Sequence, residues 1–300
     1  MKQGCILLAT DLSANAALAA RWARNCAVLT GRQVILAHII ELSVPNWLRD
    51  AYDALDDEEK KAELEGKVHE WYKTHTHTDA DGVLLAGGEP VQALNELVEE
   101  SGASLLVLAR SGKNALTRLL VGSTAQMMAV NPPCSVAVVH PDHTDIDEST
   151  KLAVATDLTI TAEEALADAA KLAALVGAQL DIVHATTLFA PTVNTRDLPE
   201  QFSPSELTAK ANQQMEKVLG EHADELTNVT YKSHVIEASP VEGLTTFAED
   251  NHSDMVFVGN AAQYSLLTNV FGRVSVKLLQ TLPSTIVIVP PPKDESSEEE

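Results

Sequence analysis

The chain contains two copies of one sequence pattern, and this duplication constrains its fold more than any other feature. The run LLATDLS at 7–13 recurs as AVATDLT at 153–159, a spacing of 146 residues. Farther along, Gly122 corresponds to Gly272, where the spacing has grown to 150. The duplication therefore predicts two tandem domains of one fold, with four extra residues in the second copy between its second and third strands.

Each copy alternates apolar runs with helix-like segments, in the order βαβαβαβαβ. Aromatic residues make up only 4% of the chain, so the cores must be aliphatic, which favours α/β layering. Strands that alternate with helices pair in parallel through right-handed crossovers. We therefore expect an α/β fold of two tandem, doubly wound, Rossmann-like domains, each with a five-stranded parallel sheet. The expected strands are 5–10, 33–40, 82–86, 105–108 and 135–140 in the first copy, and 152–156, 179–184, 229–236, 255–259 and 285–289 in the second.

The domain boundaries follow from a polar, acidic joint between the copies. We predict an N-terminal domain at 1–143, a C-terminal domain at 150–291, and a disordered acidic tail at 292–300. The fifth strands of both copies are rich in valine and isoleucine, and exposed apolar edges invite pairing. We therefore expect the two domains to form an intramolecular pseudo-dimer. A homodimer of whole chains is the second assembly that these edges allow.

Charge and composition exclude several classes of partner. The formal net charge of −22 would repel nucleic acid, so we expect no nucleic-acid partner. No apolar stretch approaches the roughly 20 residues of a membrane span, so we expect no integral membrane association. The first apolar run is too short for a secretory signal. Together with three scattered cysteines, Cys5, Cys26 and Cys134, these features predict a cytoplasmic protein with reduced thiols.

One segment of the first copy has the composition of a phosphate-binding loop. Residues 109–124 read ARSGKNALTRLLVGST and join the fourth strand to a helix. Gly112 and Gly122 let the main chain come close to a ligand, and a helix start attracts anions. The hydroxyls of Ser123 and Thr124 can donate to phosphate oxygens. The residues alone leave two interpretations open: a phosphate cradle, or a strand-to-helix turn that uses glycine for its geometry.

The spacing of this segment resembles that of universal stress proteins that bind ATP, which carry G-x2-G-x9-G-[ST] after their fourth strand. Gly112, Gly122 and Ser123 match, and Ala109 stands where the first glycine would be. The A-T-D-x-[ST] run and a histidine in the second strand extend the resemblance over almost the whole chain. Its tandem length is most similar to the E-type members of Gram-negative bacteria. The resemblance implies a cytoplasmic stress-response protein with a regulatory role.

The same resemblance implies that ATP or another adenine nucleotide would bind the first copy. Asp11 would lie near the ribose or adenine, although it could equally cap the following helix. The second copy has Ala262 in place of the second motif glycine and Arg273 in place of the serine, so we expect it not to bind ATP in the family manner. The predicted nucleotide-binding residues are Asp11, Ile39 (through its main chain), Ala109, Gly112, Gly122, Ser123 and Thr124.

Two other functions stay open. A slow adenine-nucleotide hydrolase would need a general base or a Mg²⁺ carboxylate pair, and neither is evident beside the motif, so no catalytic residue is predicted. The second domain could instead carry an apolar or metal ligand. A helix is expected over about 56–74, followed by His75, His77 and Asp79. If extended, these three would share one face and could bind zinc, the alternative being a polar loop.

Overall fold

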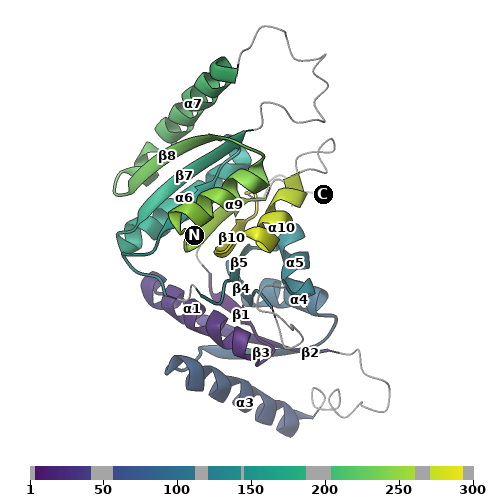
Figure 1. Cartoon of the computed structure of the whole chain (residues 1–300). Helices are drawn as coiled ribbons and strands as arrows, with labels where there is room; N and C mark the ends of the chain where they lie inside the picture. The colour runs from purple at the N-terminus through teal and green to yellow at the C-terminus, as the bar shows by residue number, and fades with distance from the viewer. Residues whose placement is uncertain are drawn as a thin grey trace, which may run out of the picture. The chain divides into compact units, whose positions relative to one another are not determined.

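The computed structural model describes residues 4–41, 57–111, 121–142, 145–186, 204–260 and 271–292 (Figure 1). The chain divides into two compact units. One comprises Met1–Ile146 together with Ser284–Val287, and the other comprises Asp147–Pro283 together with Ile288–Glu300. Within the described ranges, no helix is long and apolar enough to cross a membrane.

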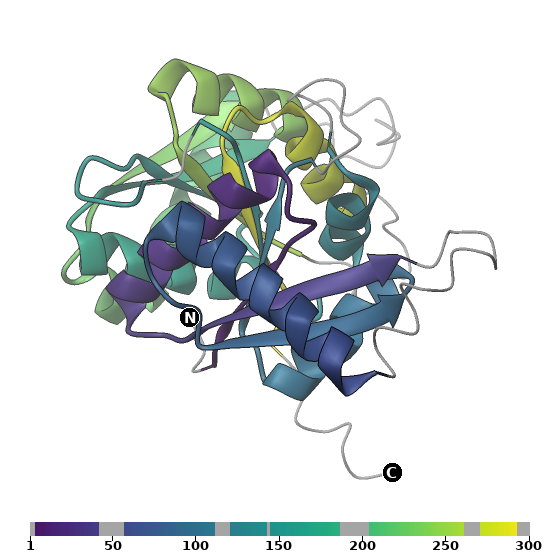
Figure 2. The same cartoon turned by 90° about the horizontal axis from the view of Figure 1, so that it is seen from below.

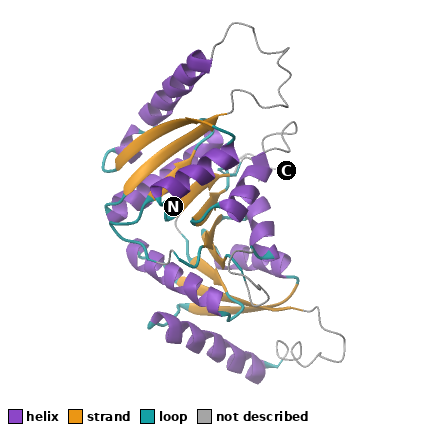
Figure 3. Ribbon diagram, viewed as in Figure 1, coloured by secondary structure: helices purple, strands orange, loops and turns teal. Residues whose placement is uncertain are grey.

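The first unit is a parallel sheet of five strands in the order β3-β2-β1-β4-β5. Helices α1 and α3 cover one face and α4 and α5 cover the other, which is the doubly wound arrangement expected (Figure 3). Figure 2 shows α3 lying along β2 and β3. Its elements are β1 (Ile6–Ala9), α1 (Ala14–Thr30), β2 (Val34–Glu41), α3 (Glu58–Thr76), β3 (Gly82–Gly88), α4 (Pro90–Ser101), β4 (Leu105–Ala109), α5 (Ser123–Val130) and β5 (Ser135–Val139).

The second copy of the pattern repeats this plan, with strands in the order β10-β9-β6-β7-β8 and parallel pairing of β6 with β7 and β9 and of β7 with β8. The expected fold class is therefore confirmed, while the pairing of the two units into a pseudo-dimer stays a prediction. Its elements are β6 (Leu152–Ala155), α6 (Ile160–Val176), β7 (Gln179–Thr186), α7 (Pro204–Glu221), α8 (Ala223–Leu226), β8 (Thr230–Glu237), α9 (Pro240–Asn251), β9 (Met255–Gly259), α10 (Phe271–Thr281) and β10 (Thr285–Val289).

The centre of the first unit is aliphatic, as its composition predicts. Ile6, Leu7 and Leu8 of β1 are fully buried, because β1 lies between β2 and β4 and is covered from both faces. The alanines that face the sheet from α1 are small, so this helix can lie close against the strands. The burial of β1 therefore places its carboxyl end, which precedes Asp11, at the middle of the sheet edge.

Arg32 joins two strands at the opposite, amino-terminal edge of the first sheet. Its Nε donates to the carbonyl of Gly4 at 2.7 Å, and its Nη2 donates to the carbonyl of Cys5 at 2.9 Å. The same Nη2 also donates to Ser104 Oγ. Since Cys5 precedes β1 and Ser104 precedes β4, one guanidinium holds the starts of the two central strands together.

We predict that Arg32→Ala lowers the free energy of unfolding of the first unit by about 2 kcal/mol, because several charge-assisted hydrogen bonds are lost. Urea unfolding of the full chain measures this. Arg21→Ala is the control, since Arg21 is exposed and donates through Nε to the carbonyl of His75. An equally small effect of both substitutions would contradict the role given to Arg32.

Candidate functional site

The order of strands in the first sheet reverses between β1 and β4. In open α/β sheets, ligands bind outside the carboxyl ends of the strands at such a reversal. Two turns follow these strand ends, one through Thr10 and Asp11 and the other through Arg110 and Ser111. The sheet therefore brings the predicted residue Asp11 and the start of the predicted motif to one edge.

The turn after β1 is held in an uncommon conformation. Leu12 has a φ of 62°, in the left-handed region that leucine rarely adopts. The amide of Leu12 donates to Thr10 Oγ1 and the amide of Ser13 donates to Asp11 Oδ1, each at 3.0 Å. Ser13 Oγ then accepts from the amide of Ala16 and caps α1. Asp11 thus has a local structural role, and its contact with a nucleotide stays a prediction.

The second unit contains the same turn. Leu158 has a φ of 61°, and its amide donates to Thr156 Oγ1 at 3.0 Å. The amide of Thr159 donates to Asp157 Oδ1, also at 3.0 Å. Because the second copy departs from the nucleotide motif and still keeps this turn, the left-handed leucine belongs to the fold of both units.

A histidine at the same place in both copies forms a hydrogen bond between this turn and the second strand of each sheet. His38 Nδ1 lies 2.8 Å from the carbonyl oxygen of Thr10, and His184 Nδ1 lies 2.9 Å from that of Thr156. A carbonyl can only accept, so Nδ1 carries the proton in both rings. The two histidines therefore position the ends of β1 and β6.

The main chain of Ile39 extends beyond the end of β1. The amide of Thr10 donates to the carbonyl of Ala37 at 2.9 Å, so the main chain of Ala37 faces β1. Main-chain groups of alternate residues in a strand point to the same side, so the N–H and C=O of Ile39 point that way too. The ladder between β1 and β2 ends at the pair Ala9–Ala37. Ile39 therefore presents one donor and one acceptor at the carboxyl edge.

Arg110 and Ser111 connect three elements at this edge. The amide of Arg110 donates to the carbonyl of Val139 in β5 at 3.2 Å, and its carbonyl accepts from the amide of Gly122 at 2.8 Å. Ser111 Oγ accepts from Asn15 Nδ2 in α1 at 2.9 Å. Arg110 and Ser111 are both buried, and burial lowers the pKa of the Arg110 guanidinium. The bond between Arg110 and Gly122 brings the start and the end of the motif segment together.

Gly122 is the N-cap of α5, and no side-chain hydrogen bond caps this helix in the part of the chain that is described. Its φ of −66° and ψ of 149° suit any residue, so backbone freedom does not require glycine here. Its own amide is bonded to Arg110, and the first bond within the helix is donated by Gln126 to the carbonyl of Gly122. Among the described residues, the amides of Ser123, Thr124 and Ala125 are therefore not used within the helix. Ser123 is exposed and Thr124 is half-buried.

Of the two remaining motif residues, Ala109 is described by the structure and Gly112 is not. Ala109 is the last residue of β4 and pairs with Val139 of β5, at the carboxyl end of the strand as predicted. Gly112 lies outside the described residues.

Nothing in the sequence singles out Asn15, because an asparagine in the first turn of a helix is ordinarily a capping or solvated residue.

The second unit differs at the corresponding helix start. The amide of Asn260 donates to the carbonyl of Val289 at 2.8 Å, as Arg110 does to Val139 in the first unit. Helix α10, however, begins at Phe271, so Gly272 lies within its first turn rather than at its N-cap. Ala262 and the side chain of Arg273 lie outside what is described, and their predicted effect on nucleotide binding stays a prediction.

The extended segment on which His75, His77 and Asp79 would share one face is not present. Helix α3 continues to Thr76, which places His75 in its last turn with Nδ1 2.7 Å from the carbonyl oxygen of Trp71. His77 then ends the helix in the left-handed conformation, with a φ of 58°. Across the described ranges, no three histidine, cysteine or acidic side chains are grouped so that they could hold a metal ion.

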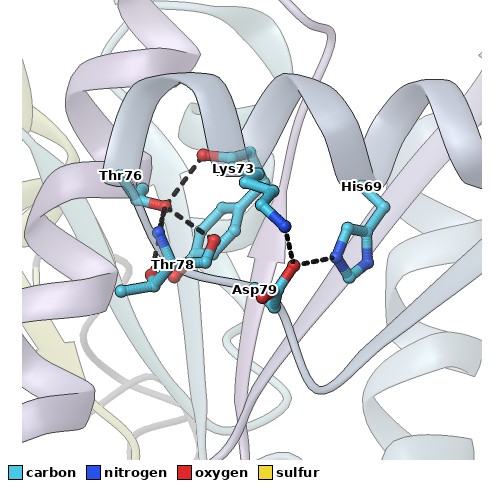
Figure 4. Close-up of polar contacts among 6 residues, drawn as sticks. His69, Lys73, Thr76, Thr78 and Asp79 are labelled. Atoms are coloured by element: carbon cyan, nitrogen blue, oxygen red, sulfur yellow. Dashed lines mark hydrogen bonds and ion pairs between the residues drawn. The ribbon is translucent and has the colours of Figure 1, made fainter.

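Asp79 instead belongs to a polar cluster at the end of α3 (Figure 4). Its Oδ1 accepts from His69 Nε2 and from Lys73 Nζ, each at 3.0 Å. The hydrogen bond from His69 contributes most to lowering the pKa of Asp79, and Lys73 adds a hydrogen bond and its charge. The same contact raises the pKa of Lys73. The cluster ties the chain that enters β3 to the last turns of α3.

Comparison with known proteins shows the class to which this arrangement belongs. The model of the Universal stress protein family matches residues 5–140 and, separately, residues 148–290. The two matches cover most of the chain, so the chain belongs to the universal stress protein family and carries two of its domains in tandem.

Individual relatives support this assignment. The chain is 31% identical over 136 residues to a universal stress protein of Thermus aquaticus, an alignment that covers 45% of this chain and 96% of that protein. It is 26% identical over 192 residues to one of Mycobacterium tuberculosis, covering 61% of this chain and 64% of the relative. A universal stress protein structure from Archaeoglobus fulgidus matches 97% of this chain and 100% of its own, with a TM-score of 0.71 and 19% identity, which shows a shared fold.

We predict that Asp79→Asn removes an acid-sensitive contribution to the stability of the first unit. Because folding lowers the pKa of Asp79, its contribution is complete above the pKa of the unfolded chain and is lost as pH falls through the lowered value. Urea unfolding of both proteins between pH values of about 3 and 7 measures this. Glu100→Gln, on the exposed surface of α4, is the control. A stability difference that is the same at every pH would contradict the prediction.

Proposed function

We propose that the chain is a regulatory stress-response protein of the cytoplasm that binds one adenine nucleotide in its first unit. This proposal rests on the hydrogen bonds made by Arg110 and Ser111, at the point where the strand order of the sheet reverses. Through them, hydrogen bonds link the helix start at Gly122 to the first turn of α1, next to Asp11. The network gathers an anion-binding helix start and a carboxylate at the edge where α/β sheets bind ligands.

The adenine would contact the main chain of Ile39. Adenine presents a hydrogen-bond donor and an acceptor side by side, and the N–H and C=O of Ile39 offer the complementary pair. The carboxylate of Asp11 is an acceptor for the ribose hydroxyls, at the end of the strand next to β2. In this assignment the end of β2 would bind the adenine, and the residue after β1 would bind the ribose.

The phosphates would bind at the start of α5. The amides and hydroxyls of Ser123 and Thr124 are donors there, and Gly112 and Ala109 would allow close approach of the main chain. Only the first copy keeps this set, because Ala262 and Arg273 replace two of its members in the second. The chain would therefore bind one nucleotide. The tandem length supports assignment to the E-type members, with the two domains paired as a pseudo-dimer.

Binding rather than hydrolysis is the activity that these residues support. The sequence shows no evident general base or Mg²⁺ carboxylate pair beside the motif. A bound nucleotide would therefore act as a signal that changes the surface of the protein rather than as a substrate.

We predict that Gly122→Val abolishes ATP binding by the full chain while the unit stays folded. Valine adopts the φ and ψ of Gly122 without strain, but its branched side chain would occupy the place of the phosphates. Gly272→Val is the matched control and should leave the affinity unchanged. Isothermal calorimetry with ATP measures both. Wild-type affinity in Gly122→Val, or loss of binding in Gly272→Val, would refute the assignment to the first unit.

We predict a smaller effect for Ser123→Ala, which removes one hydroxyl donor and keeps the helix start. The binding free energy for ATP should weaken by about 0.5–1.5 kcal/mol, the usual net contribution of one hydrogen bond. Ser149→Ala, in the joint between the copies, is the control because Ser149 Oγ donates to Asp147. Unchanged ATP affinity in Ser123→Ala would exclude the hydroxyl from the phosphate contact.

A further inference from the structure

The sheet of the second copy also has an edge at which hydrogen-bonding groups collect. Its strand order reverses between β6 and β9, and ligands of open α/β sheets bind at such a reversal. We propose that this edge is a second binding site, which takes an uncharged adenine nucleoside rather than a nucleotide. The inference extends to the second unit the base and ribose contacts proposed for the first, and in that respect it rests on the proposed function.

Asp157, in the turn after β6, supplies an acceptor for the hydroxyls of a ribose. Its Oδ1 accepts from the amide of Thr159 at 3.0 Å and from Thr159 Oγ1 at 2.5 Å. In the described part of the chain, the turn therefore uses one carboxylate oxygen and leaves Oδ2 for a ligand. A hydroxyl that donates to a carboxylate forms a charge-assisted hydrogen bond, which is stronger than a neutral one.

The turn holds this carboxylate in a fixed place at the sheet edge. Leu158, the next residue, has a φ of 61°, and its amide donates to Thr156 Oγ1. His184 of β7 holds the carbonyl oxygen of Thr156 through Nδ1 at 2.9 Å. Because these contacts repeat those around Asp11, Asp157 has the same place in its own sheet as Asp11 has in the first.

The main chain of Ala185, near the end of β7, supplies a donor and an acceptor for a base. The amide of Thr156 donates to the carbonyl of Val183 at 3.0 Å, so the main chain of Val183 faces β6. The ladder between β6 and β7 ends at the pair Ala155–Val183. Main-chain groups of alternate residues point to the same side, so the N–H and C=O of Ala185 face that side beyond the end of β6. They complement the donor and acceptor that adenine presents side by side.

The start of α10 distinguishes this edge from that of the first copy. Gly122 is the N-cap of α5, whereas the corresponding Gly272 lies within the first turn of α10, which begins at Phe271. The helix start proposed to bind phosphate is therefore not repeated. The net charge of −22 repels a polyanion such as ATP, and an uncharged nucleoside meets no such repulsion. The second edge thus keeps the groups for base and ribose without those for phosphate.

Equilibrium dialysis of labelled adenosine against the full chain, with and without saturating ATP, tests the second site. We expect two adenosines per chain without ATP and one with it, because ATP displaces adenosine from the first unit only. A chain that retains no adenosine once ATP is bound would overturn the inference while leaving the proposed function intact. A chain that binds neither ligand would overturn the proposed function as well, so the two failures are distinguishable.

Two matched variants assign the sites. Asp157→Asn keeps an Oδ1 acceptor for the turn and replaces Oδ2 by an amide group. It should raise the Kd of the adenosine that ATP does not displace by about tenfold or more, the range for a charge-assisted hydrogen bond, and leave the Kd for ATP unchanged. Asp11→Asn should do the reverse. An unchanged Kd for that adenosine in Asp157→Asn would overturn the inference.

A change in the ligand tests the same contact without any substitution. 2′,3′-Dideoxyadenosine lacks both ribose hydroxyls, so in the presence of saturating ATP it should bind the wild-type chain about tenfold or more weakly than adenosine. Equal affinities of the two compounds would exclude the hydroxyl contact with Asp157 and overturn the inference.

Discussion

The parallel pairing of β1 with β2 on one side and β4 on the other is the constraint on which the rest of the first unit depends. Parallel strands place their carboxyl ends at one edge, and the burial of β1 from both faces stabilises this arrangement. Asp11, Ile39 and Ser111 come together there because the strands that precede or carry them are neighbours. Arg32 bonds to the chain at the opposite edge, so its stabilising contacts and the predicted ligand site lie at different ends of the strands.

The second unit shows which features of the edge belong to the framework. It keeps the left-handed leucine, the histidine bonded to the strand end, and the main-chain bond to the fifth strand. It changes two residues of the predicted phosphate site, with Arg273 in place of Ser123 and Ala262 in place of Gly112. Duplication has therefore preserved the turn geometry in both copies, while the chemistry at the helix start has diverged.

The strands and their alternation with helices could be predicted because hydrophobic periodicity acts over a few residues. The strand expected at 82–86 extends to Gly88, since its ladder with β2 continues to Glu41, a tertiary contact without a local signal. The extended segment that the zinc hypothesis required is not present, because α3 continues past 74 to Thr76 and His77 follows as its C-cap in a left-handed conformation. The bond from Asn15 to Ser111 joins residues 96 apart, so spacing within the motif could not reveal it.

The central claim is that two copies of one fold provide a single nucleotide site. The stoichiometry of ATP on the intact chain tests this most directly, and native mass spectrometry across a range of ATP concentrations measures it. The account predicts saturation at one ATP per chain. Saturation at two would show that the second copy binds as well, and a chain that stays unliganded at every concentration would contradict nucleotide binding altogether.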